Sequence, residues 1–188
     1  MNIERVSGMV LLLGSLIFLI AAFLPISWVF GERDPQKKIE MINAAPGAWR
    51  FAQLLFGTGA TIASLALILV YFHLSSKGAA NPALAACILA LIGVIFWDWH
   101  VYLRANDPQA FALGQLQPGW TYAPYAILTN AALVFLGMAL LGAQYPRWIG
   151  WTGIISGILF TLSLIIFHDI PPFFFYLVTG TTAVVLIL

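Results

Sequence analysis

The chain has little charge and almost no cysteine. Of its 188 residues only 8% are charged and 62% are apolar, and Cys87 is the one cysteine. A soluble domain carries about 25% charged residues, because its surface must be solvated. The net charge of +1 excludes the clustered basic face that nucleic-acid binding needs. One cysteine excludes a disulfide framework and a thiolate metal site. The composition therefore predicts a protein whose surface meets lipid.

Six apolar segments are candidates for membrane-spanning helices. A hydrocarbon core of about 30 Å takes about 20 residues of helix, because lipid offers no partner to free backbone groups. We expect an all-α polytopic membrane protein with a single transmembrane domain over residues 1–188. The expected spans are approximately 8–30, 50–73, 82–104, 119–143, 147–168 and 172–188, the last at the lower limit of a spanning length.

Two of the connecting segments resemble each other. Asp34-Pro35 and Asp107-Pro108 each place an N-cap residue before a proline at the first helical position, which predicts a short helix. Each segment then returns to the apolar sequence through Pro-Gly and a tryptophan, at 46–49 and 118–120. Two spans separate them, so both lie on one membrane face. The similarity suggests tandem helical hairpins, formed by spans one and two and by spans three and four. Spans five and six would form the third hairpin, although the connection Asp169-Ile170-Pro171-Pro172 lacks the pattern.

Large aromatic residues gather near the ends of the expected spans. Amphipathic rings favour the headgroup zone, so we interpret these residues as interfacial anchors: Trp28, Trp49, Trp97, Trp99, Trp120, Tyr122, Tyr125, Trp148 and Trp151.

Small residues recur at helical spacing within two spans. Gly150, Gly153 and Gly157 share one face of the fifth span, and Gly57 and Thr61 share a face of the second. Such faces let helices approach closely in lipid. We expect both to be helix-packing seams.

The segment Pro146-Arg147-Trp148-Ile149-Gly150-Trp151-Thr152-Gly153-Ile154 resembles the start of the fifth span in a bacterial six-helix integral membrane family known only as a domain of unknown function. The extended loop before Trp49-Arg50 is similar too. The resemblance implies six helices in the bacterial inner membrane with both termini in the cytoplasm, and it implies no activity. The Lys and Arg count of the loops alone favours the opposite orientation.

The segment from Phe96 to Gln109 concentrates polar groups at the end of the third span. Asp98 lies on one side of that helix, and His100 and Arg104 lie nearly opposite. His168 and Asp169 end the fifth span at the same face. These five residues are the candidate ligand or cofactor cluster: Asp98, His100, Arg104, His168 and Asp169.

Two chemistries and one structural role fit this cluster. His100 and His168, with the carboxylates, are competent metal ligands, and two histidines on facing helices can hold a haem axially. A pigment is a further candidate cofactor. No known ligand spacing is present, and interfacial hydrogen bonding is the interpretation we favour.

Asn130 and Gln53 are the other polar groups in the expected spans. Asn130 lies near the middle of the fourth span, where an unpaired amide is costly. We expect it to hydrogen-bond a neighbouring helix. Gln53 lies near an interface, and we expect it to reach headgroups or loop backbone.

The pattern as a whole favours a non-enzymatic integral membrane protein. It would be an accessory subunit of a larger membrane complex, or a binder of an apolar ligand, lipid or pigment. Its partners would be membrane lipids and other membrane subunits. A membrane oxidoreductase or metal or haem enzyme built on the cluster is one alternative, and a small-molecule transporter is another. No nucleophile elbow or phosphate loop is present.

Overall fold

The computed structural model describes residues 2–116, 121–167 and 171–188. Every regular element in these ranges is a helix, which confirms the predicted all-α class. The elements are α1 (Ile3–Phe23), the 3-10 helix η1 (Pro25–Gly31), α2 (Pro35–Ala44), α3 (Pro46–Ser76), α4 (Ala80–Asn106), α5 (Pro108–Ala112), α6 (Tyr122–Gly142), α7 (Arg147–Phe167) and α8 (Phe173–Ile187).

Five helices are long and apolar enough to cross a membrane: α1, α3, α4, α6 and α7. The fold is that of a polytopic helical membrane protein. The sixth apolar helix, α8, has 15 residues, or about 22 Å at 1.5 Å per residue, and is shorter than these five.

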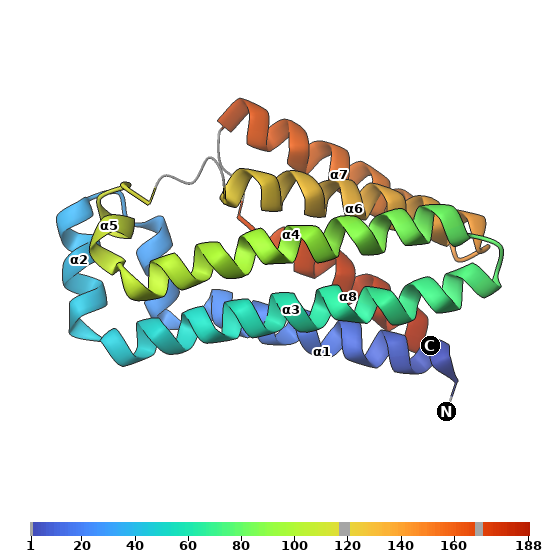
Figure 1. Cartoon of the computed structure of the whole chain (residues 1–188), viewed down its shortest axis with the longest axis horizontal. Helices are drawn as coiled ribbons and strands as arrows, with labels where there is room; N and C mark the ends of the chain where they lie inside the picture. The colour runs from blue at the N-terminus through green and yellow to red at the C-terminus, as the bar shows by residue number, and fades with distance from the viewer. Residues whose placement is uncertain (1, 117–120, 168–170) are drawn as a thin grey trace.

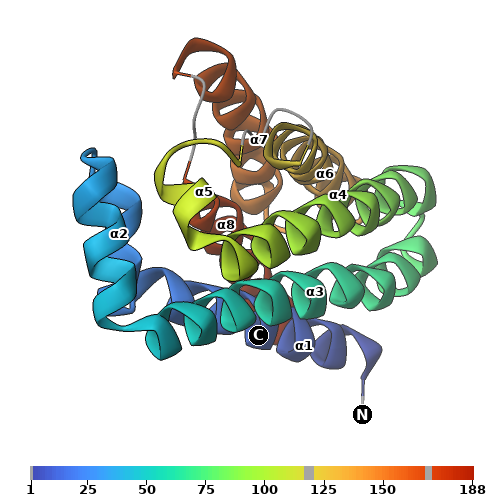
Figure 2. The ribbon, with the colours of Figure 1, turned by 60° about the vertical axis from the view of Figure 1, so that its left-hand side comes forward.

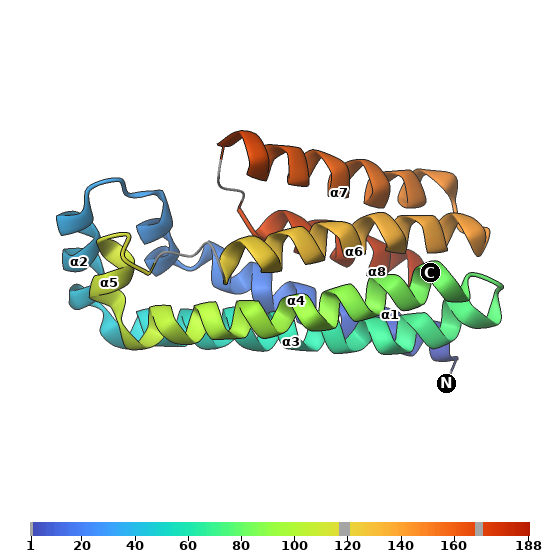
Figure 3. The same ribbon diagram turned by 45° about the horizontal axis from the view of Figure 1, so that its top comes forward.

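The long helices lie side by side along one axis (Figure 1). α1 packs on α3, α3 on α4, and α4 on α6, while α7 adds to the outside of α6 and α8 to α1. Figure 2 shows this order from nearer the end of the bundle, and Figure 3 shows α7 standing outermost. The short helices α2 and α5 lie at one end of the bundle, and both ends of the chain lie at the other.

The first span differs from its predicted range of 8–30. α1 ends at Phe23, and Leu24 is extended, with φ −62° and ψ 144°, because it precedes Pro25 and proline disfavours helical backbone before it. The Ser27 hydroxyl donates to the carbonyl oxygen of Ala21 at 2.6 Å and so pairs one of the last carbonyls of α1. The sequence after Leu24 forms η1 instead of continuing the span.

The two similar loops form the short helices that the sequence predicts. The Asp34 carboxylate accepts a hydrogen bond from the amide of Gln36, and that of Asp107 accepts one from the amide of Ala110. The helices they start, α2 and α5, contact each other at the same end of the bundle.

The third predicted hairpin is wrong. α1 with α3 and α4 with α6 are antiparallel neighbours, as expected for the first two hairpins. α7 and α8, however, touch only slightly, because α7 is packed on α6 and α8 on α1. Ser15 of α1 and Thr179 of α8 share a buried hydrogen bond of 3.0 Å between their hydroxyls.

Glycines set the two closest helix approaches. On α7, a Cβ at Gly150 would lie 2.5 Å from Cγ of Leu141, and one at Gly153 would lie 3.0 Å from the carbonyl oxygen of Leu133. Gly157 likewise lies against the backbone of α6. Between α1 and α3 the close contact falls at Gly14, against the backbone of Ala63, and at Gly59, where a Cβ would lie 2.5 Å from the backbone nitrogen of Phe18.

A network of polar side chains joins three helix ends at the face that holds both chain ends. The Tyr145 hydroxyl donates to Oε1 of Glu4, so the Tyr145 oxygen must accept from its other partners. These are Nε2 of His73 at 2.6 Å and Nζ of Lys77 at 3.2 Å. His73 therefore carries a proton on Nε2.

Replacing Tyr145 by Phe should lower the free energy of unfolding by about 1–2 kcal/mol, because it leaves Glu4 and His73 without their shared partner. Burial and the neighbouring Glu4 raise the pKa of Tyr145 above its usual 10. The folded protein thus keeps this phenol protonated where the unfolded chain ionises it, so its contribution is complete below about pH 10 and is lost as the pH rises further.

Detergent-based unfolding titrations between pH 7 and pH 11 measure both effects. The matched control is Tyr102→Phe, since Tyr102 is 56% exposed and lies outside the network. Equal stability of the two variants at every pH would show that the network contributes nothing.

Candidate functional site: a groove between α3 and α4

An open groove of about 500 Å³ runs along the outer junction of α3 and α4. This volume lies within the range of small-molecule sites, about 300–1,000 Å³. Most of its wall is apolar, and its few polar groups converge from both helices. The lining residues are Arg50, Gln53, Leu54, Gly57, Thr58, Thr61 and Ile62 of α3, and Asp98, Val101, Tyr102 and Ala105 of α4.

Asp98 is the acidic group of this groove. The Thr61 hydroxyl donates to Asp98 Oδ2 at 2.8 Å and fixes the carboxylate against α3. Oδ1 of Asp98 is buried and has no hydrogen-bond partner. In the described ranges no Lys or Arg nitrogen lies within 4 Å of either oxygen. The groove thus contains a positioned carboxylate, and Arg50, which also lines the groove, lies beyond ion-pair distance of it.

The Asp98 carboxylate lies deeper in the bundle, along its long axis, than the C-terminal end of α1. Phe18 lies against Gly59, and α1 ends five residues later, at Phe23. Thr61 is two residues deeper than Gly59 in the antiparallel helix, so it lies about seven residues, or about 10 Å, inside that level. Asp98, which is bonded to Thr61, shares this depth. The Asp98 carboxyl group thus lies at the level of the long apolar helices and lines the open groove between two of them.

Gly57 forms the floor of the groove beside Asp98. A Cβ at Gly57 would lie 3.5 Å from Oδ1 of Asp98 and 3.8 Å from Cγ1 of Val101, which is ordinary contact. No helix therefore needs a glycine here, in contrast to Gly59. Glycine inside a helix costs about 1 kcal/mol relative to alanine, and what it provides at this position is open space. The expected packing seam at Gly57 and Thr61 is thus part of the groove.

Gln53 lies one turn from Gly57 on the same side of α3. It is 1% exposed, and neither its amide nitrogen nor its amide oxygen has a hydrogen-bond partner. The expectation that Gln53 reaches headgroups or loop backbone is therefore wrong. A buried amide without partners costs about 1–3 kcal/mol. A polar group that enters the groove and hydrogen-bonds to Gln53 would offset part of this cost.

His100 and Arg104 do not join Asp98. Nδ1 of His100 lies 3.0 Å from the Thr121 hydroxyl, and the His100 ring packs against Trp97 and Tyr122. No group of three or more His, Cys, Asp or Glu side chains suited to a metal occurs among the described residues. His168 and Asp169 lie outside those residues, so the metal or haem cluster stays a prediction.

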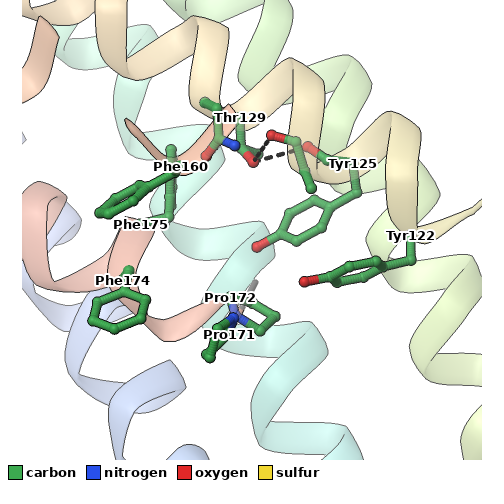
Figure 4. Close-up of a pocket in the computed structure, with 10 residues that line it drawn as sticks. Tyr122, Tyr125, Thr129, Phe160, Pro171, Pro172, Phe174 and Phe175 are labelled. Carbon is green, nitrogen blue, oxygen red and sulfur yellow. Dashed lines mark hydrogen bonds between the residues drawn. The ribbon is translucent and has the colours of Figure 1, made fainter. Parts of the chain in front are cut away.

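Asn130 lines a second, much smaller cavity between α6, α7 and the start of α8 (Figure 4). Its volume is about 10 Å³, roughly that of one water. Asn130 is 4% exposed, and its Nδ2 has no hydrogen-bond partner. The hydrogen bond expected between this amide and a neighbouring helix is not made by Nδ2. The cavity is too small for an organic ligand.

Trp49 and Trp97 are not interfacial anchors, since each is only 1% exposed. The Trp49 indole donates to the carbonyl oxygen of Arg104 at 3.1 Å, and the Trp97 indole donates to that of Phe56 at 3.2 Å. These bonds tie α4 to α3 and hold the groove walls at a fixed separation. The role of interfacial anchor fits exposed tryptophans better. Trp28 and Trp148, for example, are 74% and 55% exposed.

Comparisons of the chain with protein-family models, with curated proteins and with solved structures gave no match.

Proposed function

We propose that this membrane protein binds a lipid-soluble molecule with a cationic or N–H-donating head in the groove between α3 and α4. The observation that carries the proposal is the carboxylate of Asp98, which Thr61 holds in a mostly apolar groove and which has no Lys or Arg of the described residues within 4 Å. An unpaired charge near hydrocarbon is costly. A ligand that brings an ammonium group offsets that cost, and its tail lies along the apolar walls.

The shape of the groove supports the same ligand class. It is open along its outer side, so a molecule dissolved in the bilayer reaches it without crossing water. Leu54 and Ile62 of α3, which line it beside the polar groups, suit a hydrocarbon tail. The resident molecule would be an amphiphilic amine.

Binding of dodecylamine and of dodecanol to the protein in nanodiscs tests this proposal. The wild-type protein should prefer the ammonium by at least about tenfold, which corresponds to about 1.4 kcal/mol. Asp98→Asn should remove that preference, because it removes the charge but keeps the shape. Displacement of a dansyl-labelled alkylamine measures both affinities.

The control for this substitution is Asp34→Asn at the start of α2. Asparagine caps a helix as well as aspartate does, so this variant removes one negative charge away from the groove. Equal affinities for amine and alcohol in the wild-type protein, or equal effects of the two substitutions, would contradict the proposal.

We also propose that both termini face the cytoplasm in a bacterial inner membrane, as in the six-helix family that the segment 146–154 resembles. The position of both chain ends at one end of the bundle supports placing them on one side (Figure 1). Labelling of single cysteines placed at Asn2 and at Gln36, in a Cys87→Ser background, tests the orientation in intact cells. Labelling at Asn2 alone by an impermeant thiol reagent would reverse it.

A further inference from the structure

Arg104 is a buried cation without an acid. It lies in the last turn of α4 and is 5% exposed. No Asp or Glu oxygen of the described ranges lies within 4 Å of it. Its Nε and Nη2 are buried without a hydrogen-bond partner. A buried charge of this kind is strongly unfavourable unless something pairs with it.

Four aromatic rings surround the guanidinium. Its Cζ lies 5.0 Å from the ring centroids of Phe30 and Trp97, 5.7 Å from that of Phe56 and 5.9 Å from that of Phe111. Rings attract the cation through their faces. The rings accept no hydrogen bonds from the in-plane N–H donors of the guanidinium. This aromatic cage therefore offsets only part of the cost of burying the charge.

The two donors without a partner lie on the same edge of the guanidinium. Nε–H and one Nη2–H point in parallel from a planar arginine, and this pair matches the two oxygens of a carboxylate or a phosphate. The backbone beneath is fixed, because the Arg104 carbonyl accepts from the Trp49 indole. From this geometry we propose that Arg104 binds an oxyanion, a carboxylate or phosphate, through this edge.

The short helices at the end of the bundle supply two rings of the aromatic cage, since Phe30 lies in η1 and Phe111 in α5. η1, α2 and α5 lie together at the end of the bundle (Figures 1 and 2). Val29, Ile42 and Trp49 form a small hydrophobic cluster of their own, with Phe111 packed against it. This cluster adjoins the main core, because Ile26 packs against both and the Phe30 ring lies 5.8 Å from that of Phe56. The oxyanion is either a free small anion or the headgroup of an anionic lipid, because Arg104 lies near the end of its span.

Arginine side-chain NMR tests this assignment on the full chain. The sequence has five arginines, so ¹⁵Nε labelling in nanodiscs of zwitterionic lipid gives five signals. Arg104→Lys identifies the Arg104 signal by its loss. Contacts of the Nε–H proton with the Phe30 and Trp97 rings identify it independently if that variant fails to fold. The probes are inorganic phosphate, sodium acetate, and nanodiscs with one fifth phosphatidylglycerol.

A saturable shift of the Arg104 signal with phosphate or acetate, with at least tenfold slower exchange of its Nε–H with water, assigns a free anion. The same change with phosphatidylglycerol alone assigns a lipid headgroup. The exposed Arg50 provides the control, and Arg50→Gln should leave the response of Arg104 intact. An Arg104 signal that responds to none of the probes, or only in parallel with the other four, overturns the proposal.

Discussion

Gly59→Leu should lower the free energy of unfolding by about 3 kcal/mol, the upper part of the range for overpacked cores. The new Cβ would meet the backbone nitrogen and Cα of Phe18, at 2.5 and 2.9 Å, and backbone atoms cannot move aside as a side chain can. α1 and α3 must therefore separate along their whole contact. Because α8 also packs on α1, the displacement spreads to a third helix. Unfolding in mixed micelles followed by circular dichroism measures the loss.

Gly47→Leu is the matched control, since it places the same side chain in the same helix. A Cβ at Gly47 has no neighbour within 4 Å, so the change should stay within about 0.5 kcal/mol. Similar losses in the two variants would mean that the stability of the bundle does not depend on the close approach of α1 and α3.

The second large effect is expected at Gly57. Gly57→Leu should weaken alkylammonium binding at least about thirtyfold, or about 2 kcal/mol, because the leucine side chain occupies the floor of the groove beside Asp98. The fold should survive, since a Cβ here finds only ordinary contacts at 3.5 and 3.8 Å. Competition with the dansyl-labelled alkylamine in nanodiscs measures the affinity.

Gly57→Ala tests whether the loss of affinity increases with the size of the side chain at position 57. It fills less of the groove, so the loss of affinity should be smaller than with leucine, while the helix gains up to about 1 kcal/mol of stability. Binding that is unchanged by Gly57→Leu would place the ligand elsewhere on the protein.

The two proposed binding sites have one feature in common: the charged side chain in each, Asp98 or Arg104, forms no salt bridge with the described residues. Asp98 and Arg104 both lack an ionic partner in the described part of the chain. They point to different sides of α4, since one lines the groove with α3 and the other lies in the aromatic cage. Neither can neutralise the other, so each would gain from a ligand of opposite charge.

Much of the fold follows from local chemistry. Lipid imposes helices on apolar segments, and the Asp-Pro pairs start α2 and α5 through contacts within a few residues. The helical period correctly separates Asp98 from His100. These predictions need no knowledge of which helices touch.

The remaining features depend on the register between helices. Gly57 and Gly59 differ by two residues, and only the position of α1 decides that Gly59 is the close contact. The pairing of Thr61 with Asp98 likewise follows from how α3 and α4 are aligned. Trp49 is buried because η1 and α5 fold over it, and a tryptophan near a span end gives no sign of such a cover.

The most direct test of the central claim is photolabelling with a diazirine-bearing alkylamine in nanodiscs, followed by peptide mapping. The account predicts labels at residues 54–62 of α3 and 98–105 of α4, protected by excess dodecylamine and reduced by Asp98→Asn. Labels concentrated on the exposed outer face of α7, or spread over all helices without protection, would contradict it.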